Sequence, residues 1–424
     1  MQQISLTSDQ ISGASFLARS NVAMLADVPG LGKTAQVVRA CDILNVRSAT
    51  VLVPNQTLAA NFAAEFQKWS LLGHDLHILR RGTDEVPSKG ILFVTYALAS
   101  RSEVARQLIK RRACVLICDE AHMLKERASQ RTKTALRKTG IFGNARQTWL
   151  LTGTPAPNHA GELYVFAKIT GAWPHSYGAF VDRFCITNEN AFGIQIIGSK
   201  NHAELKALLA PYYMRRDKVE GRPPLTVDTR YVEASSSIDP YEKLLPADLE
   251  SVKLAIETGN WSLADIPAVA TVRRAVGLAK ADGVAELVNA ERDGGFKRHL
   301  IFAWHTDVID RLQKLIPDSV IFDGRTSQTR KDAIDAAIKS DDGPPVVIAQ
   351  LAAAGVGYTW TNHARVVIAE PAWTPDVNDQ AIARAWRKGQ ASPVLASFVA
   401  LKGSLDQRIT AALHRKSEDV ARII

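Results

Sequence analysis

The sequence predicts an α/β fold with two doubly wound parallel sheets in tandem and a short helical insertion. The first observation behind this prediction is a series of short apolar runs without polar alternation, separated by stretches of helical periodicity. Such runs are typical of parallel strands that are buried on both faces of a sheet. The second observation is that the series occurs twice in 424 residues, a length that suits more than one hydrophobic core.

The first series supplies the strands of an N-terminal lobe. These expected strands are the runs at 22–25, 50–53, 91–95, 113–120 and 148–151. Helical spacing appears between them, as at 58–69, and also before them at 6–17, where Ser8 or Asp9 can cap a helix. Because helical crossovers connect parallel strands, any ligand is expected at the carboxyl ends of these strands.

The second series predicts a C-terminal lobe. Its expected strands are the runs at 300–303, 320–322, 346–349, 366–368 and 395–399. Residues 174–233 show no clear period and contain the break Pro223-Pro224, so we place the domain boundary there. The predicted lobes are 1–222 and 223–424, and a helical insertion is expected at about 239–292.

Composition indicates an ordinary soluble protein, with 46% hydrophobic and 22% charged residues. No apolar run approaches the ~20 residues of a membrane span, and no signal segment begins the chain, so we expect a cytoplasmic protein without membrane contact. The four cysteines lack metal-ligand spacing, which predicts reduced packing residues and no metal cluster; they are Cys41, Cys114, Cys118 and Cys185. The net charge of +9 favours a polyanionic partner, although a solvated surface can carry the same excess.

The most informative stretch is ADVPGLGKT at residues 26–34, which lies between an expected strand and an expected helix. This order suits a phosphate-binding loop: the glycines let backbone N–H groups face a triphosphate, and the helix dipole adds positive potential. Lys33 supplies a charge for the outer phosphates, and Thr34 offers a hydroxyl to Mg²⁺. The strict motif has glycine where this chain has Asp27, so a simple glycine turn remains an alternative.

An acidic pair, Asp119-Glu120, ends the strand expected at 113–120. At a strand end beside a phosphate loop, one carboxylate can hold Mg²⁺ and its neighbour can orient or deprotonate the attacking water. The alternative is that both carboxylates cap the following helix. Together with the loop, the pair favours nucleotide hydrolysis.

The second lobe has no phosphate loop of its own but has a basic segment at 380–390. If this segment is helical throughout, Arg384 shares one face with Arg387 and with Gln380. A guanidinium suits the charge that develops on a transferring phosphoryl group. The alternative is a basic helix end stopped by Gly389. For the other basic pairs, Arg215-Arg216 and Arg273-Arg274, an exposed helix face is the preferred interpretation.

The order of these motifs resembles that of superfamily-two helicases. LTGTP at 151–155 belongs to the same order. Finer matches resemble the Swi/Snf-type DNA translocases and their compact annealing-helicase-like branch: Asp27 before the glycine loop, Asn158 with Glu162-Leu163, DGRTS at 323–327 and the spacing Gln-x3-Arg-x2-Arg-x-Gly-Gln. The similarity covers about residues 6–409 and implies two RecA-like lobes that use ATP and Mg²⁺ on double-stranded or branched DNA.

The resemblance also implies roles for individual residues. Glu120, Arg384, Arg387 and Gln380 would form the catalytic set, with Arg387 the preferred arginine finger. Nucleotide contacts would come from Gln10 at the adenine edge, and from Asp27, Gly30, Leu31, Gly32, Lys33, Thr34, Asp119, His122, Gly355 and Gly357. Thr34 and Asp119 would hold the metal, and His122 with Thr152 and Thr154 would couple hydrolysis to lobe movement.

The chain departs from the family pattern at Val28-Pro29, which should affect loop rigidity, and at Ala352, where a hydroxyl often contacts the DNA backbone. We predict a monomeric duplex-tracking motor of bacteriophage or bacterial type. A strand-separating helicase and an ATP-switched clamp remain alternatives. No wedge is evident for strand separation, except for a loop such as Phe192-Gly193-Ile194.

Overall fold

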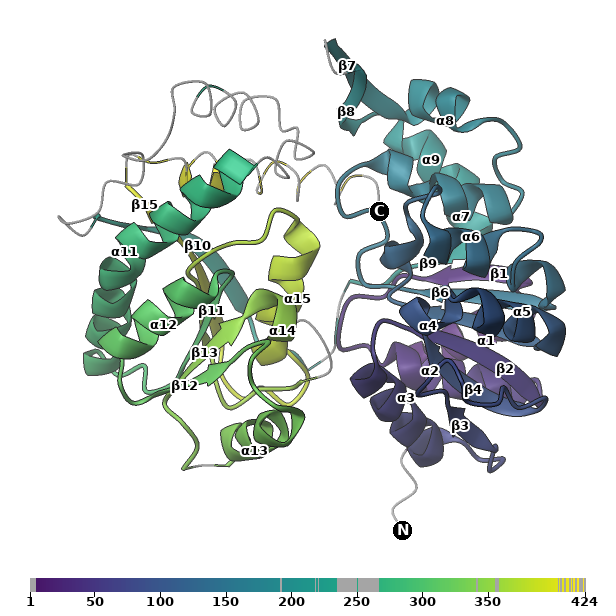
Figure 1. Cartoon of the computed structure of the whole chain (residues 1–424), viewed down its shortest axis with the longest axis horizontal. Helices are drawn as coiled ribbons and strands as arrows, with labels where there is room; N and C mark the ends of the chain where they lie inside the picture. Colours follow the sequence, from purple (N-terminus) through teal and green to yellow (C-terminus); the bar gives the residue numbers. More distant parts are fainter. Residues whose placement is uncertain are drawn as a thin grey trace. The chain divides into compact units, whose positions relative to one another are not determined.

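The computed structural model describes residues 5–190, 193–217, 219, 221–234, 250, 267–340, 342–354 and 358–402, with 404, 406, 407, 409–411, 413, 415, 418 and 422 beyond them. The chain divides into two compact units (Figure 1). The first takes in the described residues of Met1–Thr187, Gly198–Val219 and Val420–Ile424, and the second those of Asn188–Ile197 and Glu220–Asp419. The lobe limits at 222 and 223 remain a proposal.

The first unit is built on a seven-stranded parallel sheet with the order β3-β4-β2-β5-β6-β1-β9. Its strands are β1 (Val22–Leu25), β2 (Ser48–Val53), β3 (Leu76–Ile78), β4 (Gly90–Thr95), β5 (Val115–Asp119), β6 (Gln147–Leu151) and β9 (Tyr213–Met214). All five strands expected from the first series are present. The alternating order places β1, β5 and β6 together in the middle of the sheet.

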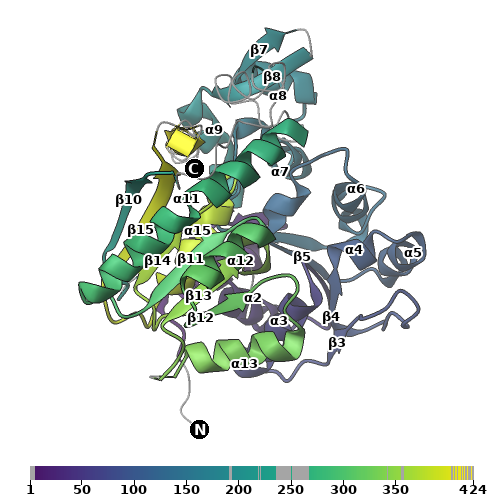
Figure 2. The same ribbon diagram turned by 60° about the vertical axis from the view of Figure 1, so that its left-hand side comes forward.

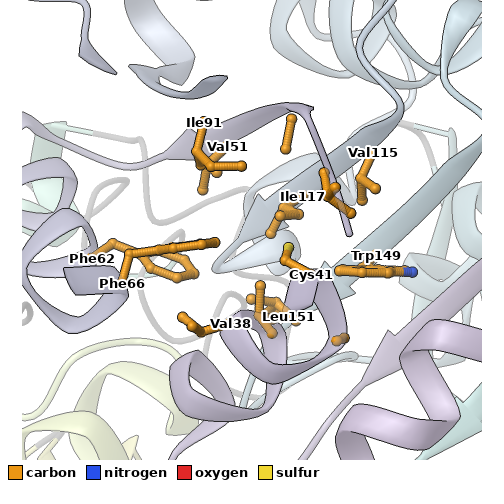
Figure 3. Close-up of a cluster of buried hydrophobic side chains, with 14 of the residues drawn as sticks. Val38, Cys41, Val51, Phe62, Phe66, Ile91, Val115, Ile117, Trp149 and Leu151 are labelled. Atoms are coloured by element: carbon orange, nitrogen blue, oxygen red, sulfur yellow. The ribbon is translucent and has the colours of Figure 1, made fainter. Parts of the chain in front are cut away.

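Three helices cover one face of this sheet: α1 (Ser8–Arg19), α2 (Lys33–Ile43) and α3 (Gln56–Trp69). Figure 3 shows the resulting core, in which Val38 and Cys41 of α2 and Phe62 and Phe66 of α3 pack against strand residues such as Trp149. Trp149 is fully buried, and the rings of Phe62 and Phe93 lie 5.7 Å apart. Alternate strand residues such as Leu52 and Leu92 are buried as well, so both faces of the sheet are covered.

The remaining helices of the first unit are short. They are α4 (Tyr96–Ala99), α5 (Ser102–Arg111), α6 (Gln130–Leu136), α7 (Tyr164–Ile169), α8 (Tyr177–Phe184) and α9 (His202–Leu209), with 3₁₀ turns at Ala121–Leu124, Phe142–Asn144, Ala160–Leu163 and Ala210–Tyr212. Their caps follow local rules: Asn55, for example, accepts a hydrogen bond from Leu58 N at the start of α3.

The second unit contains a six-stranded parallel sheet with the order β10-β15-β14-β11-β13-β12. Its strands are β10 (Leu225–Val232), β11 (His299–Ala303), β12 (Ser319–Phe322), β13 (Val346–Gln350), β14 (Arg365–Ile368) and β15 (Val394–Leu401). The five strands expected from the second series are therefore present. The prediction of two parallel α/β sheets in tandem is confirmed.

Helices cover both faces of this second sheet. The helices α11 (Pro267–Asp293) and α12 (Thr306–Leu315) pack side by side on one face (Figure 2). The opposite face is covered by α13 (Gln328–Ile338), α14 (Leu351–Ala354) and α15 (Pro375–Ala385). The helical insertion expected at 239–292 is helical from residue 267; residues 239–249 and 251–266 lie outside the described part of the chain.

The prediction of an irregular segment at 174–233 is wrong. This segment contains α8, α9, β9 and β10, together with a separate two-stranded sheet of β7 (Cys185–Asn190) and β8 (Gly193–Ser199). The strand β10 lies at a sheet edge, and its alternating half-exposed side chains left no continuous apolar run to recognise. The strand β9 has only two residues.

The β7–β8 hairpin includes Gly193 and Ile194, which belong to the stretch named above as a possible wedge. Its base is fixed by a hydrogen bond from Ala160 N to Ser199 Oγ, 3.0 Å long. Three isoleucines of this hairpin are solvent-exposed: Ile186, Ile194 and Ile197. Phe192 lies outside the described residues. Within the described part of the chain, no helix is both long and apolar enough to cross a lipid bilayer.

A buried ion pair ties α11 to the second sheet. The fully buried guanidinium of Arg365 donates two hydrogen bonds of 2.7 Å to the carboxylate of Glu291, and His299 Nε2 lies 3.0 Å from the same carboxylate. Burial alone would raise the pKa of Glu291, but the hydrogen bonds from His299 and Arg365 lower it to about 2.

We predict that Glu291→Gln lowers the free energy of unfolding by about 3 kcal/mol at neutral pH, because Arg365 would stay buried without its carboxylate. The folded-state pKa of Glu291 lies below the ordinary value of 4.5, so this contribution is complete above that pH and is lost as the pH falls toward about 2. Denaturant unfolding of both proteins at pH 7 and at lower pH measures the difference.

The control is Glu233→Gln, which removes the exposed partner of Lys402, and it should leave stability nearly unchanged. Equal losses in the two variants at pH 7 would contradict the role of the buried pair.

Candidate functional site

The glycine loop lies between β1 and α2 and has the backbone that a phosphate cradle requires. Gly30 has a φ of 100° and Gly32 a φ of 71°, both in the region that favours glycine. A Cβ at Gly32 would also lie 2.5 Å from Gln10 Nε2. Gly32 is the N-cap of α2, so the backbone N–H groups at this helix end have no intrahelical partner and can bind an anion.

Lys33 and Thr34 follow at the first two positions of α2. Lys33 Nζ donates a hydrogen bond of 2.6 Å to the carbonyl oxygen of Asp27, so the ammonium lies over the loop that precedes it. The side chain of Asp27 itself is fully buried and bonds to protein groups. The structure thus brings the predicted phosphate-binding residues together at the carboxyl end of β1.

The acidic pair lies at the end of β5, which is separated from β1 only by β6. Burial, and then the charge of Glu120, raise the pKa of Asp119 to about 7, while Lys33 opposes the shift. Tyr96 Oη donates a hydrogen bond of 2.7 Å to the carbonyl oxygen of Asp119 and so fixes the strand end. Glu120 has a φ of 49°, a left-handed conformation that is rare for a residue with a side chain.

These residues fit a bound Mg²⁺. Two adjacent carboxylates share a partly buried strand end, and the raised pKa of Asp119 indicates that more positive charge would stabilise them. Among the described residues, no cluster of three or more His, Cys, Asp and Glu side chains is arranged as a metal cage. Mg²⁺ typically takes one or two protein carboxylates together with substrate phosphates, so Asp119 and Thr34 would be suitable ligands.

His122 connects the acidic pair to the next strand. Its Nδ1 lies 3.3 Å from Glu120 Oε2 and 3.2 Å from Thr152 Oγ1, at the end of β6. Thr152 is fully buried, and its hydroxyl accepts a hydrogen bond of 3.0 Å from Thr154 N. These contacts link His122, Thr152 and Thr154, and the coupling role that the resemblance implies for them stays a prediction.

The glycine loop touches this second loop as well. A Cβ at Gly153 would lie 3.1 Å from Pro29 Cδ, so the proline ring and the glycine pack closely. Pro29, which departs from the family pattern, thus contacts the TGTP segment. A further network holds the chain after the acidic pair: Lys125 Nζ lies 2.7 Å from Glu162 Oε1, and Asn158 Nδ2 donates to the same carboxylate.

Gln10 lies beside the glycine loop. It caps its own helix in a reciprocal box, in which Thr7 N donates to Gln10 Oε1 and Gln10 N donates to Thr7 Oγ1. Its Nε2 donates to Leu31 O over 3.4 Å. The side chain predicted to read the adenine edge is therefore attached to the loop predicted to bind phosphate.

In the second unit, the structure corrects the helix expected at 380–390. The helix α15 ends at Ala385, so Arg384 lies in its last turn and Arg387 in the following turn. Arg384 is buried and donates to Tyr358 O over 3.0 Å, whereas the half-buried Arg387 donates to Thr359 Oγ1 over 3.1 Å. The last helical hydrogen bond of α15 runs from Trp386 N to Ile382 O, and the chain leaves the helix after it. Arg387 therefore lies beyond the helix and does not share a helix face with Arg384.

Sequence reasoning missed a third arginine near this segment. The guanidinium of Arg222 stacks on the ring of Trp386, 4.0 Å from its centroid, and Trp386 Nε1 donates to Pro223 O. Burial, and then the charge of Arg387, lower the pKa of Arg222 to about 10. No motif identified this pairing, because residues 222 and 386 are far apart in the sequence.

The structure places the remaining residues named in the sequence analysis as follows. Gln380 is half-buried on α15, and Ala352 is exposed on α14. Gly355 and Gly357 lie outside the described residues. The helix-face interpretation is wrong for Arg215-Arg216, which follow β9 outside any helix. It holds for Arg274 on α11, but Arg273 is packed over Trp304 and Trp373.

The sequence also matches known families. A model of the SNF2-related domain matches residues 10–254 of the 424. The chain belongs to the SNF2-related family. A model of the helicase conserved C-terminal domain matches residues 279–389. The protein is thus an SNF2-family ATPase of the helicase class.

Two relatives of this SNF2 chain are considerably longer than the chain itself. It is 27% identical over 430 residues to the mouse DNA annealing helicase and endonuclease ZRANB3, covering 95% of this chain and 39% of that protein. Similarly, it is 27% identical over 419 residues to the Xenopus tropicalis SWI/SNF-related matrix-associated actin-dependent regulator of chromatin subfamily A-like protein 1, covering 96% of this chain and 44% of that protein. The chain therefore spans less than half of either relative.

Among solved structures, the SNF2 chain is similar to the Sulfolobus solfataricus SWI2/SNF2 ATPase core in complex with dsDNA. The sequence identity is 20%, the TM-score is 0.46, and the match covers 99% of this chain and 94% of that chain.

We predict different defects for two substitutions in this SNF2 site. Lys33→Ala should weaken ATP binding, because it removes the charge over the glycine loop. Glu120→Gln should retain binding and stop turnover, because the amide cannot accept a proton from water. Calorimetric ATP binding and steady-state hydrolysis separate the two effects. Hydrolysis by Glu120→Gln at the wild-type rate would refute the role of Glu120.

Proposed function

We propose that this SNF2-family ATPase is stimulated by DNA and uses ATP hydrolysis to translocate along double-stranded DNA, remodelling or annealing DNA structures. One observation carries the proposal: the glycine loop with Lys33 follows β1, and the pair Asp119-Glu120 ends β5, at the same edge of one sheet with only β6 between the two strands. Loop, lysine and carboxylates in this arrangement support phosphoryl transfer to water.

In the proposed reaction, the loop N–H groups and Lys33 would hold the phosphates, and Thr34 and Asp119 would hold Mg²⁺. When bound, Mg²⁺ would neutralise charge on the phosphate oxygens. Glu120 then orients the attacking water and accepts its proton. Its left-handed backbone supports this role, since strained conformations of this kind cluster at functional sites where surrounding contacts maintain them.

His122 is the proposed relay from hydrolysis to movement. It contacts both Glu120 and Thr152, so a change in the charge of Glu120 alters the hydrogen bonding at the end of β6. In turn, Thr152 binds Thr154 N in the loop that also packs on Pro29. These contacts form a continuous network of the kind through which coupling can travel.

Arg387 is the preferred transition-state arginine. Arg384 is buried and donates a hydrogen bond to Tyr358 O, so its role would be to hold the segment that begins at Tyr358 in place. Arg387 lies outside the helix and is less buried, which leaves its guanidinium better able to reach a phosphate. The neighbouring Arg222 adds positive charge at the same place.

DNA is the proposed polymer substrate for two reasons. The net charge of +9 favours a polyanion, and the curated names of the relatives include DNA annealing helicase. Contacts to phosphates would dominate such binding, so little sequence preference is expected. The proposed substrate is double-stranded or branched DNA, as the resemblance to annealing helicases implies.

Strand separation is the second candidate, favoured by the exposed isoleucines of the β7–β8 hairpin. Apolar side chains of this kind can insert between bases and unstack them. A third possibility, an ATP-switched clamp with little hydrolysis, is disfavoured by the contact between His122 and Glu120, which a passive switch would not require.

We predict that Arg387→Ala lowers the DNA-stimulated hydrolysis rate by about 10³-fold or more with nearly intact ATP affinity, as for other transition-state arginines. Arg415→Ala, at an exposed position near the C-terminus, is the control and should change the rate little. Steady-state rates with saturating duplex DNA measure the difference. Similar small effects from both substitutions would exclude Arg387 as the finger.

The proposal as a whole predicts that duplex DNA stimulates hydrolysis more than RNA does, and that the protein displaces the third strand of a triplex. Displacement needs movement along the duplex but not the separation of its strands, which costs about 1.4 kcal/mol of stacking per base-pair step. ATPase rates with duplex, single-stranded DNA, forked DNA and RNA should be measured beside the triplex assay.

A forked-duplex unwinding assay with the same preparation distinguishes the candidates. Strong fork unwinding without triplex displacement would favour strand separation by the β7–β8 hairpin. Absence of DNA-stimulated hydrolysis would favour the clamp.

A further inference from the structure

We propose that Arg216 is a positioning residue of the nucleotide site, because it joins the glycine loop to the turn that bears Gln10. Through this link it sets the preference of the site for adenine. This inference rests on the proposed function, because it concerns the same ATP site. The sequence pattern alone favoured an exposed helix face for the pair Arg215-Arg216, and Arg216 lies 189 residues from Asp27 in the sequence.

The first contact of Arg216 explains the residue that departs from the strict phosphate-loop motif. Asp27 is fully buried, and its carboxylate accepts hydrogen bonds of 3.0 Å from both Arg216 N and Arg216 Nε, and another from Arg216 Nη2. Gln36 Nε2 donates a further bond of 3.0 Å to it. A buried carboxylate is costly unless it is paired and hydrogen-bonded, so Arg216 is what allows Asp27 to occupy this position.

Through Asp27 the guanidinium reaches the phosphate-binding lysine. The carbonyl oxygen of Asp27 accepts the bond from Lys33 Nζ, so the position of the Asp27 backbone sets that of the ammonium. The backbone of Arg216 reinforces this link, because Val28 N donates to Arg216 O over 3.1 Å. A second such bond, 2.7 Å from Ala26 N to Met214 O, continues the pairing of β1 with β9.

The second contact of Arg216 leads to the base-reading turn. Arg216 Nη1 donates to the carbonyl oxygen of Asp9 and lies 3.7 Å from its carboxylate. Asp9 directly precedes Gln10 in the first turn of α1, so the guanidinium holds the residue to which Gln10 is attached. Gln10 Nε2 in turn bonds to Leu31 O of the glycine loop.

The third contact joins these two branches. Arg216 Nη2 donates to Gln36 Oε1 over 2.7 Å, and Gln36 Nε2 donates to Leu31 O over 3.2 Å. Gly13 makes the arrangement possible, because a Cβ there would lie 1.7 Å from Gln36 Oε1 and 2.8 Å from Arg216 Nη2. One guanidinium therefore bonds to α1, to α2 and to the loop between β1 and α2.

Only an arginine can make this set of contacts. Its planar fork bonds in three directions at once, whereas a lysine ammonium is a single point charge on a flexible stem. Lysine at this position would keep the charge beside Asp27 but would lose the geometry that reaches both Asp9 and Gln36. The phosphate and base functions of Arg216 can therefore be separated by substitution.

The test compares the full chain with Arg216→Lys and Arg216→Gln, using ATP and GTP. Steady-state kcat and KM are measured with saturating duplex DNA, and the Kd of each nucleotide is measured by calorimetry. We expect Arg216→Gln to raise KM and Kd for ATP about tenfold or more, the effect of losing one well-formed interaction. We expect Arg216→Lys to retain more ATP affinity but to show a several-fold smaller preference for ATP over GTP.

If Arg216→Gln alone does not fold, the double variant Asp27→Asn with Arg216→Gln replaces it in the test. The double variant has no carboxylate at position 27, so no buried charge is left unpaired. It should melt near the wild-type temperature and still lose ATP affinity and base preference. The matched control is Arg183→Gln, which removes an equally well-formed but exposed bidentate pair with Glu204 and should alter no constant more than twofold.

The outcomes distinguish this inference from the proposed function. Unchanged KM, Kd and ATP preference in all folded Arg216 variants would overturn the positioning role, as would a loss of kcat alone that is equal for both nucleotides. A wild-type protein that binds ATP but does not hydrolyse it would refute the proposed function, while the Kd values would still test Arg216.

Discussion

The burial of both faces of a parallel sheet is the constraint on which the structure depends. Parallel strands can be joined only by crossovers, and in each unit helices pack on the two sides of the sheet. Every strand consequently ends at the same edge. The glycine loop after β1, the acidic pair after β5 and the TGTP segment after β6 meet there for this reason.

The first unit contains two acidic residues with different surroundings, the fully buried Asp27 and the partly buried Asp119. Asp27 has a fixed partner, because Arg216 encloses its carboxylate and holds it within the protein. Asp119 has no such enclosure; its pKa is raised to about 7 by burial and by Glu120, with Lys33 opposing. A carboxylate whose hydrogen bonds and charge partner come from the protein suits a structural role. A carboxylate whose charged form additional positive charge would stabilise suits the role of a metal ligand.

Many features of the fold were predictable from local sequence because they depend on residues that are close together in the chain. Continuous apolar runs identified all ten expected strands, and the glycines marked the loop before α2. Three kinds of element could not be predicted in this way. The short strand β9 and the edge strand β10 lack a continuous apolar run, and the end of α15 at Ala385 depends on contacts such as that of Trp386 with Pro223.

By itself, the sequence determined the class of site. The strand, glycine loop and helical stretch at 22–40 and the acidic pair at a strand end are patterns encoded within a few consecutive residues. Tertiary structure alone decided which distant groups complete that site. Arg216 reaches Asp27, Asp9 and Gln36, Arg222 stacks on Trp386, and Arg384 turns inward to Tyr358. The physical reason is that no periodicity or spacing in the sequence marks which groups an arginine will contact. Its partners are set by strand order and by the packing of helices on the sheet.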